Sequence, residues 1–154
     1  MGKEIAARFK DKGIQRIVTI EASGIAVALP VAIEMDVPLV FARKKKSILM
    51  TDDVYHSVVY SYTKEENYDV TISKRFLPEG EKVLIIDDFL ASGEAAMGLC
   101  KLVESAGDTV EGIAIVIEKS FQPGRERLER AGYDVQSLVR IKAFENDRCV
   151  FIEE

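Results

Sequence analysis

The sequence predicts an α/β fold built on a mostly parallel central sheet flanked by helices, and two observations support this prediction. Short apolar runs alternate along the chain with longer amphipathic runs, as they do in consecutive βαβ units. The strongest apolar runs, at 17–20 and 83–86, are rich in β-branched residues, which is typical of strands buried on both faces of a sheet.

The first part of the chain predicts one βαβ unit. Gly13 marks the end of the first helix, and Pro30 falls inside the second, where we expect a kink or a place near the first turn. The periodicity disappears from Arg43 to about Asp53, which predicts an exposed, mobile connection. The elements expected here are a helix over 2–12, a strand over 15–20, a helix over about 25–35 and a strand over 37–42.

An antiparallel hairpin is then expected as an insertion in the parallel pattern, because two alternating stretches, 54–63 and 68–74, flank a short polar run. The parallel pattern resumes after it, with Gly107 and Gly132 ending the helices. The elements expected are strands over 83–87 and 112–117, helices over 94–106 and 125–131, and strands near 134–141 and 148–152.

Composition excludes several classes of protein. A chain of 154 residues matches one domain, and its net charge of -5 argues against binding nucleic acid through overall charge. The apolar runs are far shorter than the roughly 20 residues of a membrane span, and the N-terminus lacks the apolar core of a signal peptide. We therefore expect a cytoplasmic protein that binds neither membranes nor nucleic acid.

Cysteine and histidine are too few to organise a metal site or a disulfide framework. Cys100 and Cys149 lie far apart in the sequence, and we expect both to be buried as small apolar residues. The single histidine, His56, cannot build a histidine-based metal centre alone. We therefore expect neither a disulfide framework nor a zinc site.

The most informative segment is 83–95, with the sequence VLIIDDFLASGEA. Apolar residues lead into Asp87 and Asp88, and a small-residue loop then opens a helix. Ligands of open α/β sheets bind outside the carboxyl ends of strands, and a helix N-terminus offers free N–H groups to a phosphate. Adjacent carboxylates accept bonds from sugar hydroxyls or bind Mg²⁺. The segment predicts a sugar-phosphate site, although Asp88 alone could instead cap the helix.

Two familiar nucleotide-binding motifs are excluded by their spacing. No two glycines occur at i and i+2, so the dinucleotide fingerprint is missing. The glycine pairs at i and i+5, which end at Gly98 and Gly112, are followed by Leu99 and Ile113 rather than lysine. The site is therefore neither a Rossmann nor a P-loop site.

The segment 83–95 resembles the phosphoribosyl diphosphate (PRPP) signature of type I phosphoribosyltransferases. Three other segments are similar to parts of the same family: 17–26 to the loop that holds pyrophosphate, 41–47 to the basic start of the flexible loop, and 116–126 to the base-recognition segment. The last of these, VIEKSFQPGRE, is most similar to bacterial members that act on xanthine.

The resemblance implies one phosphoribosyltransferase domain over 1–154, with the flexible loop and hairpin at about 43–75 and the base-recognition segment at about 117–126. It also implies transfer of a 5-phosphoribosyl group from PRPP to xanthine, giving xanthosine 5′-monophosphate and pyrophosphate in purine salvage. Mg²⁺ would enter with PRPP, beside Asp87 and Asp88. A homodimer is implied as well, with loop contacts from either the same or the neighbouring subunit.

The site residues follow from the same resemblance. Lys119 would donate to the exocyclic oxygen of the purine, and Phe121 would pack on its ring face. The PRPP ligands implied are Asp87 and Asp88 for the ribose, Ala91, Ser92, Gly93, Glu94 and Ala95 for the 5-phosphate, Ser23 and Gly24 for the pyrophosphate, and Arg43, Lys44 and Lys46 for its charge.

No motif identifies a catalytic acid or base. Several 6-oxopurine relatives begin the phosphate loop with an aspartate near the purine, whereas this chain has Ala91. Lys64, Glu65 and Glu66 are candidates only because they fall in the hairpin segment. Family members also have a segment before the point that matches Met1, which forms part of a hood over the base, and we expect its contacts to be missing here.

Three alternatives share the expected fold. The chain could act on adenine or another purine, it could be a non-catalytic regulator that senses PRPP, or it could be a fragment that binds PRPP and dimerises without turnover. A regulator that binds DNA usually needs a basic face or an added helix-turn-helix segment. This chain is acidic and begins directly in the fold, so the sequence favours the enzyme.

Overall fold

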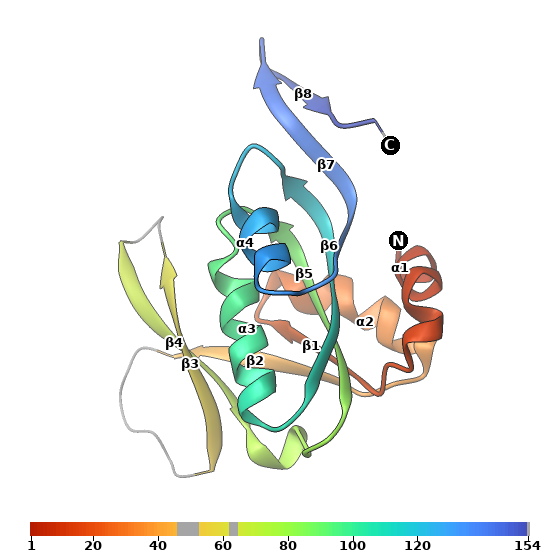
Figure 1. Cartoon of the computed structure of the whole chain (residues 1–154), viewed down its shortest axis with the longest axis vertical. Helices are drawn as coiled ribbons and strands as arrows, with labels where there is room; N and C mark the ends of the chain where they lie inside the picture. The colour runs from red at the N-terminus through yellow and green to blue at the C-terminus, as the bar shows by residue number, and fades with distance from the viewer. Residues whose placement is uncertain (46–52, 62–64, 154) are drawn as a thin grey trace.

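The computed structural model describes residues 1–45, 53–61 and 65–153 (Figure 1). Within these ranges the strands form one eight-stranded sheet in the order β3–β4–β2–β1–β5–β6–β7–β8. The strands are β1 (Arg16–Ile20), β2 (Leu39–Lys45), β3 (Val54–Ser61), β4 (Glu66–Ser73), β5 (Lys82–Leu90), β6 (Thr109–Lys119), β7 (Val135–Glu145) and β8 (Arg148–Phe151).

The five central strands, from β2 to β7 in spatial order, are parallel, whereas β3 and β4 at one edge and β8 at the other are antiparallel. This confirms the predicted α/β class with its inserted hairpin. A parallel sheet brings the carboxyl ends of its strands to one edge, so residues at the ends of β1, β5 and β6 can share a site.

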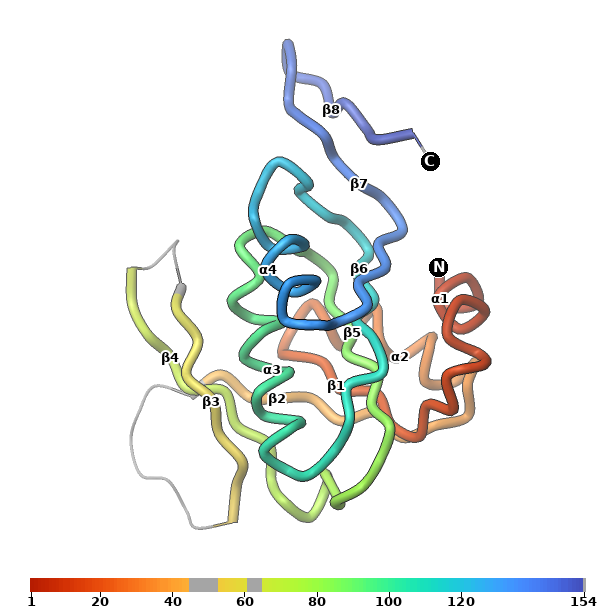
Figure 2. The backbone as a smooth tube through the Cα atoms, viewed as in Figure 1, coloured from red at the N-terminus to blue at the C-terminus, as the bar shows by residue number. Residues whose placement is uncertain are grey.

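Helices cover both faces of the sheet (Figures 1 and 2). One core joins α1 and α2 to one face, and the other joins α3 and α4 to the opposite face. Alternate residues of β5 serve the two cores: Ile85 packs toward α3, and Leu84 and Ile86 pack toward α2. The helices are α1 (Gly2–Phe9), α2 (Ser23–Met35), α3 (Glu94–Ser105) and α4 (Gly124–Arg130), with short 3₁₀ turns η1 (Lys10–Lys12) and η2 (Lys74–Phe76).

The expectation of an irregular connection from Arg43 is wrong for its first residues. Arg43 and Lys44 continue β2 and pair with Thr71 and Val70 of β4. The antiparallel partner binds the backbone of this basic run, which overrides its polar composition. The rest of the predicted connection, 46–52, lies outside the described residues.

The expectation that both cysteines are buried is wrong for Cys149. Cys100 is buried on α3 as expected, but Cys149 is exposed on β8. An edge strand has one neighbour and no helix over both faces, so a small apolar residue there need not be buried. Among the described residues, no helix has the length and apolar character to cross a membrane.

Candidate functional site

Asp87 and Asp88 lie inside β5, near its carboxyl end, rather than in the loop that follows. Pairing of β5 with β6 continues to Leu90, so the sheet holds both aspartates. Successive strand residues point to opposite faces, and accordingly Asp87 is buried, at 6% exposure, whereas Asp88 is partly exposed. The backbone N–H of Asp88 donates to Oδ1 of Asp87 at 3.0 Å.

Burial raises the pKa of Asp87 to about 7, and the neighbouring Asp88 side chain adds to the rise. The positive charge of Lys44 acts in the opposite direction and lowers this pKa. Asp87 is therefore a carboxyl group whose ionisation can respond to a cationic or hydroxyl-bearing ligand near neutral pH.

The turn that begins α2 approaches this aspartate closely. A Cβ atom on Gly24 would lie 2.3 Å from Oγ1 of Thr19 and 3.1 Å from Oδ1 of Asp87, so only glycine fits there. The Thr19 hydroxyl is buried and has no hydrogen-bond partner among the described residues. Gly24 thus allows the first turn of α2 to lie close to Thr19 of β1 and Asp87 of β5. Ser23, beside it, is exposed.

The loop after β5 has the geometry of a phosphate-binding loop. Gly93 has φ of 83°, a conformation that favours glycine, and α3 begins at the next residue, Glu94. The first N–H groups of a helix have no partner within it, so those of α3 are available to an anion. Ala91, Ser92 and Ala95 belong to the same loop and first turn, as the sequence predicts.

Lys119 ends β6, beside the end of β5, and its Nζ lies 5.1 Å from the ring centroid of Phe89. Phe89 lies between the partly exposed Asp88 and the buried Leu90, and is itself 42% exposed. Phe121 instead packs edge-on against Phe144 of β7, with centroids 5.7 Å apart.

Phe89 is therefore the aromatic ring beneath Lys119, and the sequence analysis missed it. A large apolar residue directly after the acidic pair was the available signal. The expected strand ends at residue 87, and no local pattern shows that pairing with β6 continues through Phe89 and leaves its ring exposed. The pairing of Phe121 with Phe144 joins loop 120–123 to β7, which no local pattern could indicate.

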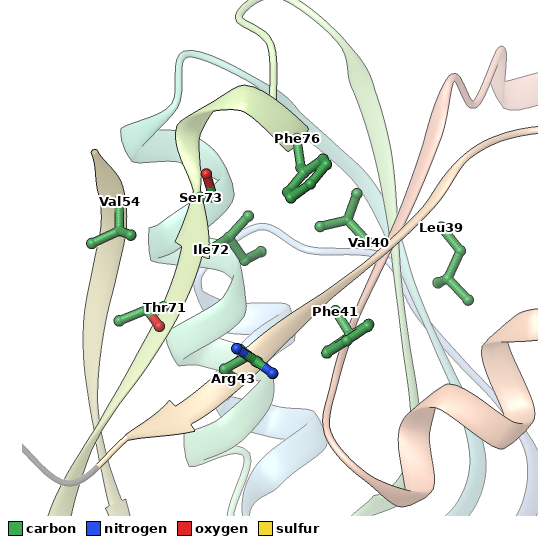
Figure 3. Close-up of a pocket in the computed structure, with 9 residues that line it drawn as sticks. All are labelled: Leu39, Val40, Phe41, Arg43, Val54, Thr71, Ile72, Ser73 and Phe76. Carbon is green, nitrogen blue, oxygen red and sulfur yellow. The ribbon is translucent and has the colours of Figure 1, made fainter. Parts of the chain in front are cut away.

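The basic residues of β2 separate to opposite faces. The backbone N–H of Lys44 donates to Oε1 of Glu21 at 2.7 Å, and its Nζ lies 5.7 Å from the ring centroid of Tyr68. Arg43 lines an apolar groove of about 440 Å³ between β2, β4 and η2, in which Phe41 and Phe76 also lie (Figure 3). The structure thus brings Lys44, but not Arg43, to the side of Asp87; Lys46 lies outside the described residues.

The hairpin places a different residue near the site from those the sequence suggested. Glu65 and Glu66 are exposed at the start of β4, and Lys64 lies outside the described residues. Tyr68, also on β4, is partly buried, and burial followed by the charges of Asp87 and Glu94 raises its pKa. Sequence patterns could not indicate Tyr68, because its position depends on the pairing of β4 with β2.

Among the described residues, no cluster of three or more His, Cys, Asp or Glu side chains could hold a metal ion. Asp87 and Asp88 supply carboxylate oxygens from one strand only. These oxygens suit Mg²⁺ that brings further ligands with it, such as water and the oxygens of a phosphorylated substrate. The two carboxylates therefore fit a cation that arrives with a phosphorylated substrate.

One edge of the sheet thus combines an acidic pair, a glycine turn, a loop at a helix N-terminus, and a lysine above an aromatic ring. This combination defines the chain as a phosphoribosyl transferase. The family model for the phosphoribosyl transferase domain matches residues 3–147, and the chain belongs to this family.

Individual relatives agree with the family. The chain is similar to the xanthine phosphoribosyltransferase of Listeria innocua, at 56% identity over 154 residues that cover 100% of this chain and 80% of that protein. It is also similar to the xanthine phosphoribosyltransferase of Exiguobacterium sp., at 56% identity over 99% of this chain and 79% of that protein. The protein of the same name from Acinetobacter baylyi is 51% identical, over 100% of this chain and 81% of its own length.

Solved structures of related enzymes share the fold. The adenine phosphoribosyltransferase of Thermoanaerobacter pseudethanolicus has a TM-score of 0.80 and 29% identity, covering 90% of this chain and 77% of that one. The APRTase of Giardia lamblia, complexed with 9-deazaadenine, has a TM-score of 0.81 and 28% identity, covering 92% and 78%. The relatives that are 51–56% identical to this chain are named for xanthine, whereas these solved structures, named for adenine, are only 28–29% identical.

Proposed function

We propose that this chain transfers the 5-phosphoribosyl group of PRPP to xanthine and releases pyrophosphate, forming xanthosine 5′-monophosphate. The observation that supports this most directly is the position of Asp87 and Asp88. They lie between the turn at Gly24 and the loop that ends at Gly93, so groups suited to pyrophosphate, ribose and 5-phosphate meet at one strand end. The relatives named xanthine phosphoribosyltransferase lend further support.

Each part of PRPP has a matching group. The partly exposed Asp88 and the buried Asp87 accept hydrogen bonds from the ribose hydroxyls. The N–H groups of loop 91–95 bind the 5-phosphate, and those of the turn at 23–24 bind pyrophosphate. Lys44 lies close enough to Asp87 to affect its pKa and adds positive charge on the same side.

Breaking the bond between C1 of the ribose and pyrophosphate leaves positive charge on the sugar and negative charge on the leaving group. The chain's main task is therefore to hold both ends of PRPP and to stabilise the departing anion. Mg²⁺ bound to PRPP supplies charge neutralisation at the pyrophosphate. Asp87 and Asp88 orient the ribose so that C1 faces the base.

Lys119 favours an oxopurine over adenine. Its ammonium group is only a donor, so it pairs with an exocyclic oxygen of xanthine, whereas adenine presents an amino group that is itself a donor. A buried or partly buried donor left without an acceptor weakens binding. Phe89, beneath the lysine, offers an apolar ring on which the planar base can stack.

Dimerisation belongs to the same proposal. Two apolar grooves share Leu39: one is lined by Leu29 and Ile33 of α2, and the other by Phe41 and Arg43 of β2 (Figure 3). Ile33 is 72% exposed, which is unusual for an isoleucine on a helix. We propose that a second copy of the chain covers this face, so that Arg43 points toward the partner. Light scattering of the chain and of an Ile33→Glu variant tests this.

The activity is tested by incubating the chain with PRPP, Mg²⁺ and each of xanthine, guanine, hypoxanthine and adenine. We expect the highest kcat/KM with xanthine and the lowest with adenine. Preference for adenine would overturn the assignment of the base. PRPP binding without turnover of any base would overturn the enzymatic proposal and favour a PRPP-sensing regulator.

A further inference from the structure

A buried carboxylate lies directly behind the base-recognition segment. Glu118 precedes Lys119 in β6, and its side chain is 1% exposed. Arg125, at the start of α4, donates from Nε to both carboxylate oxygens of Glu118, at 3.0 and 2.9 Å, and from Nη2 to one of them at 2.7 Å. This bidentate pair joins the end of β6 to α4.

Three more groups bind the same carboxylate. The Ser120 hydroxyl donates to Oε1 at 2.7 Å, the Ser137 hydroxyl donates to Oε2, and Nε of Arg140 donates to Oε1 at 3.3 Å. Ser120 lies at one end of loop 120–123 and Arg125 lies just beyond the other, so one carboxylate holds both ends of the loop.

This carboxylate is ionised throughout the neutral range. Burial acts to raise the pKa of Glu118, but hydrogen bonds from Arg125, Ser120 and Ser137 outweigh burial and lower the pKa to about 2. A buried ion pair is costly to form and is often no more stabilising than apolar residues of similar size. The Glu118–Arg125 pair is therefore expected to act mainly by fixing the conformation of loop 120–123.

Lys119 is the residue that this conformation controls. Successive strand residues point to opposite faces, so Glu118 reaches the α4 side and Lys119 reaches the ring of Phe89. The backbone on both sides of the lysine is also held, because Ser120 N–H donates to Ile141 O at 2.9 Å and Gln122 N–H donates to Lys119 O at 2.9 Å.

We propose that Glu118 is a positioning residue for base recognition: it fixes the loop through Ser120 and Arg125 and thereby holds the Lys119 ammonium over the base. The proposal rests on the function proposed above. Glu118 touches neither PRPP nor the base, so its loss affects use of the base more than use of PRPP.

The test compares steady-state kinetics of Glu118→Gln, Ser120→Ala and Ser120→Thr with those of the unmodified chain. For Glu118→Gln we expect the KM for xanthine to rise about tenfold, the effect of one lost charge-assisted hydrogen bond, while the KM for PRPP changes less than about twofold. Ser120→Ala should show a smaller rise, and Ser120→Thr, which keeps the hydroxyl, should restore the KM.

Glu129→Gln is the matched control. Glu129 also pairs with Arg125, at 2.8 Å, but it lies within α4 and its side chain is 50% exposed, whereas that of Glu118 is buried. Its variant should leave both KM values unchanged. If Glu118→Gln does not fold, as judged by circular dichroism, the Ser120 pair provides the test.

Hydrogen exchange gives a readout that does not need turnover. In Glu118→Gln or Ser120→Ala, the amides of Ser120 and Gln122 should exchange faster, while those of 83–87 keep their protection. Unchanged exchange in the loop, or equal rises in the two KM values, would overturn the positioning role. If the unmodified chain uses none of the bases, the proposed function fails, and the exchange result still decides whether Glu118 holds the loop.

Discussion

Gly93 and Gly124 meet backbone to backbone, and this contact joins the phosphate-binding loop to the start of α4. A Cβ atom on Gly93 would lie 3.0 Å from Cα of Gly124, and the Gly124 N–H donates to the carbonyl of Ala91 at 3.0 Å. The parts of the site that we assign to the 5-phosphate and to the base are therefore packed together rather than carried on independent loops.

Replacing Gly124 by alanine should disturb this contact. The added methyl group would lie 2.4 Å from the Ala91 carbonyl oxygen, so we expect a loss of about 2 kcal/mol in the free energy of unfolding, typical of overpacking, and weaker PRPP binding. Urea unfolding and calorimetric titration with PRPP measure the two effects.

Gly132→Ala is the control for the Gly124 prediction. Gly132 has φ of 95°, and within the described part of the chain no atom lies within 4 Å of an added Cβ, so alanine there destabilises through backbone conformation alone. It should lower stability and leave PRPP affinity intact. A similar loss of PRPP affinity in both variants would contradict a specific role for the Gly93–Gly124 contact.

Arg127 should support the phosphate loop from α4. Its Nη1 donates to the Ser92 carbonyl at 2.9 Å and also pairs with Glu94. We expect Arg127→Gln to raise the KM for PRPP about fivefold, the effect of one partly exposed hydrogen bond of about 1 kcal/mol. Arg130→Gln, on the same helix, removes a residue that is 77% exposed and pairs only with Glu126 among the described side chains; it should leave this KM unchanged. Equal KM values for PRPP in Arg127→Gln and Arg130→Gln would contradict a role for Arg127 in supporting the phosphate loop.

The raised pKa of Asp87 should make stability pH-dependent. The folded chain binds this proton up to about pH 7, whereas the unfolded chain releases it near 3.8, so Asp87 costs stability progressively as the pH rises between these values. We expect Asp87→Asn to become more stable relative to the unmodified chain as the pH rises from 4 to 7, with no further gain above pH 7. It should also lose PRPP binding.

Urea unfolding at several pH values measures the difference between Asp87→Asn and the unmodified chain. Asp11→Asn, at an exposed carboxylate of η1, is the control and should show no comparable trend. A stability difference that does not vary with pH would mean that Asp87 is ionised at little cost in the folded chain.

Lys119→Met should reduce discrimination between bases. Methionine keeps the apolar stem and removes the ammonium donor, so kcat/KM for xanthine should fall by about tenfold or more, the cost of one charge-assisted hydrogen bond, while that for adenine changes little. The KM for PRPP should not change. Competition assays with paired bases measure the preference directly, and an unchanged preference would remove Lys119 from the base site.

Substituting Phe89 or Phe121 should show which of the two rings stacks on the base. If the base stacks on the ring beneath Lys119, Phe89→Leu should raise the KM for xanthine severalfold, because leucine keeps the apolar bulk but loses the flat ring face. Phe121→Leu should have the smaller effect, since its ring packs on Phe144. The reverse order would restore the role that the sequence assigned to Phe121.

Much of the site could be predicted because its parts are contiguous. Segment 83–95 contains a strand, an acidic pair, a glycine loop and a helix start, and each of these has a local signature that does not depend on distant residues. The alternation of β-branched and amphipathic runs likewise predicted the order of strands and helices, although β5 and β6 extend further than their apolar runs suggested.

Other features depend on which segments become neighbours. β4 pairs with β2, which orders Arg43 and Lys44 as a strand and sends them to opposite faces. The same pairing brings Tyr68 toward Asp87. The polar composition of Arg43 and Lys44 correctly predicted that their side chains are exposed. It could not predict that their backbone is paired in a strand, because the partners, Thr71 and Val70, lie far away in the sequence.

The sequence by itself thus determined the fold class, the acidic pair and the phosphate loop, since these are written in short-range patterns of apolar, acidic and small residues. Only the tertiary structure decided which ring lies under Lys119, which lysine or arginine of β2 faces Asp87, and how Glu118 holds the loop. These choices depend on distances between residues of different strands, and such distances are set by the packing of the sheet and its helices rather than by any single segment.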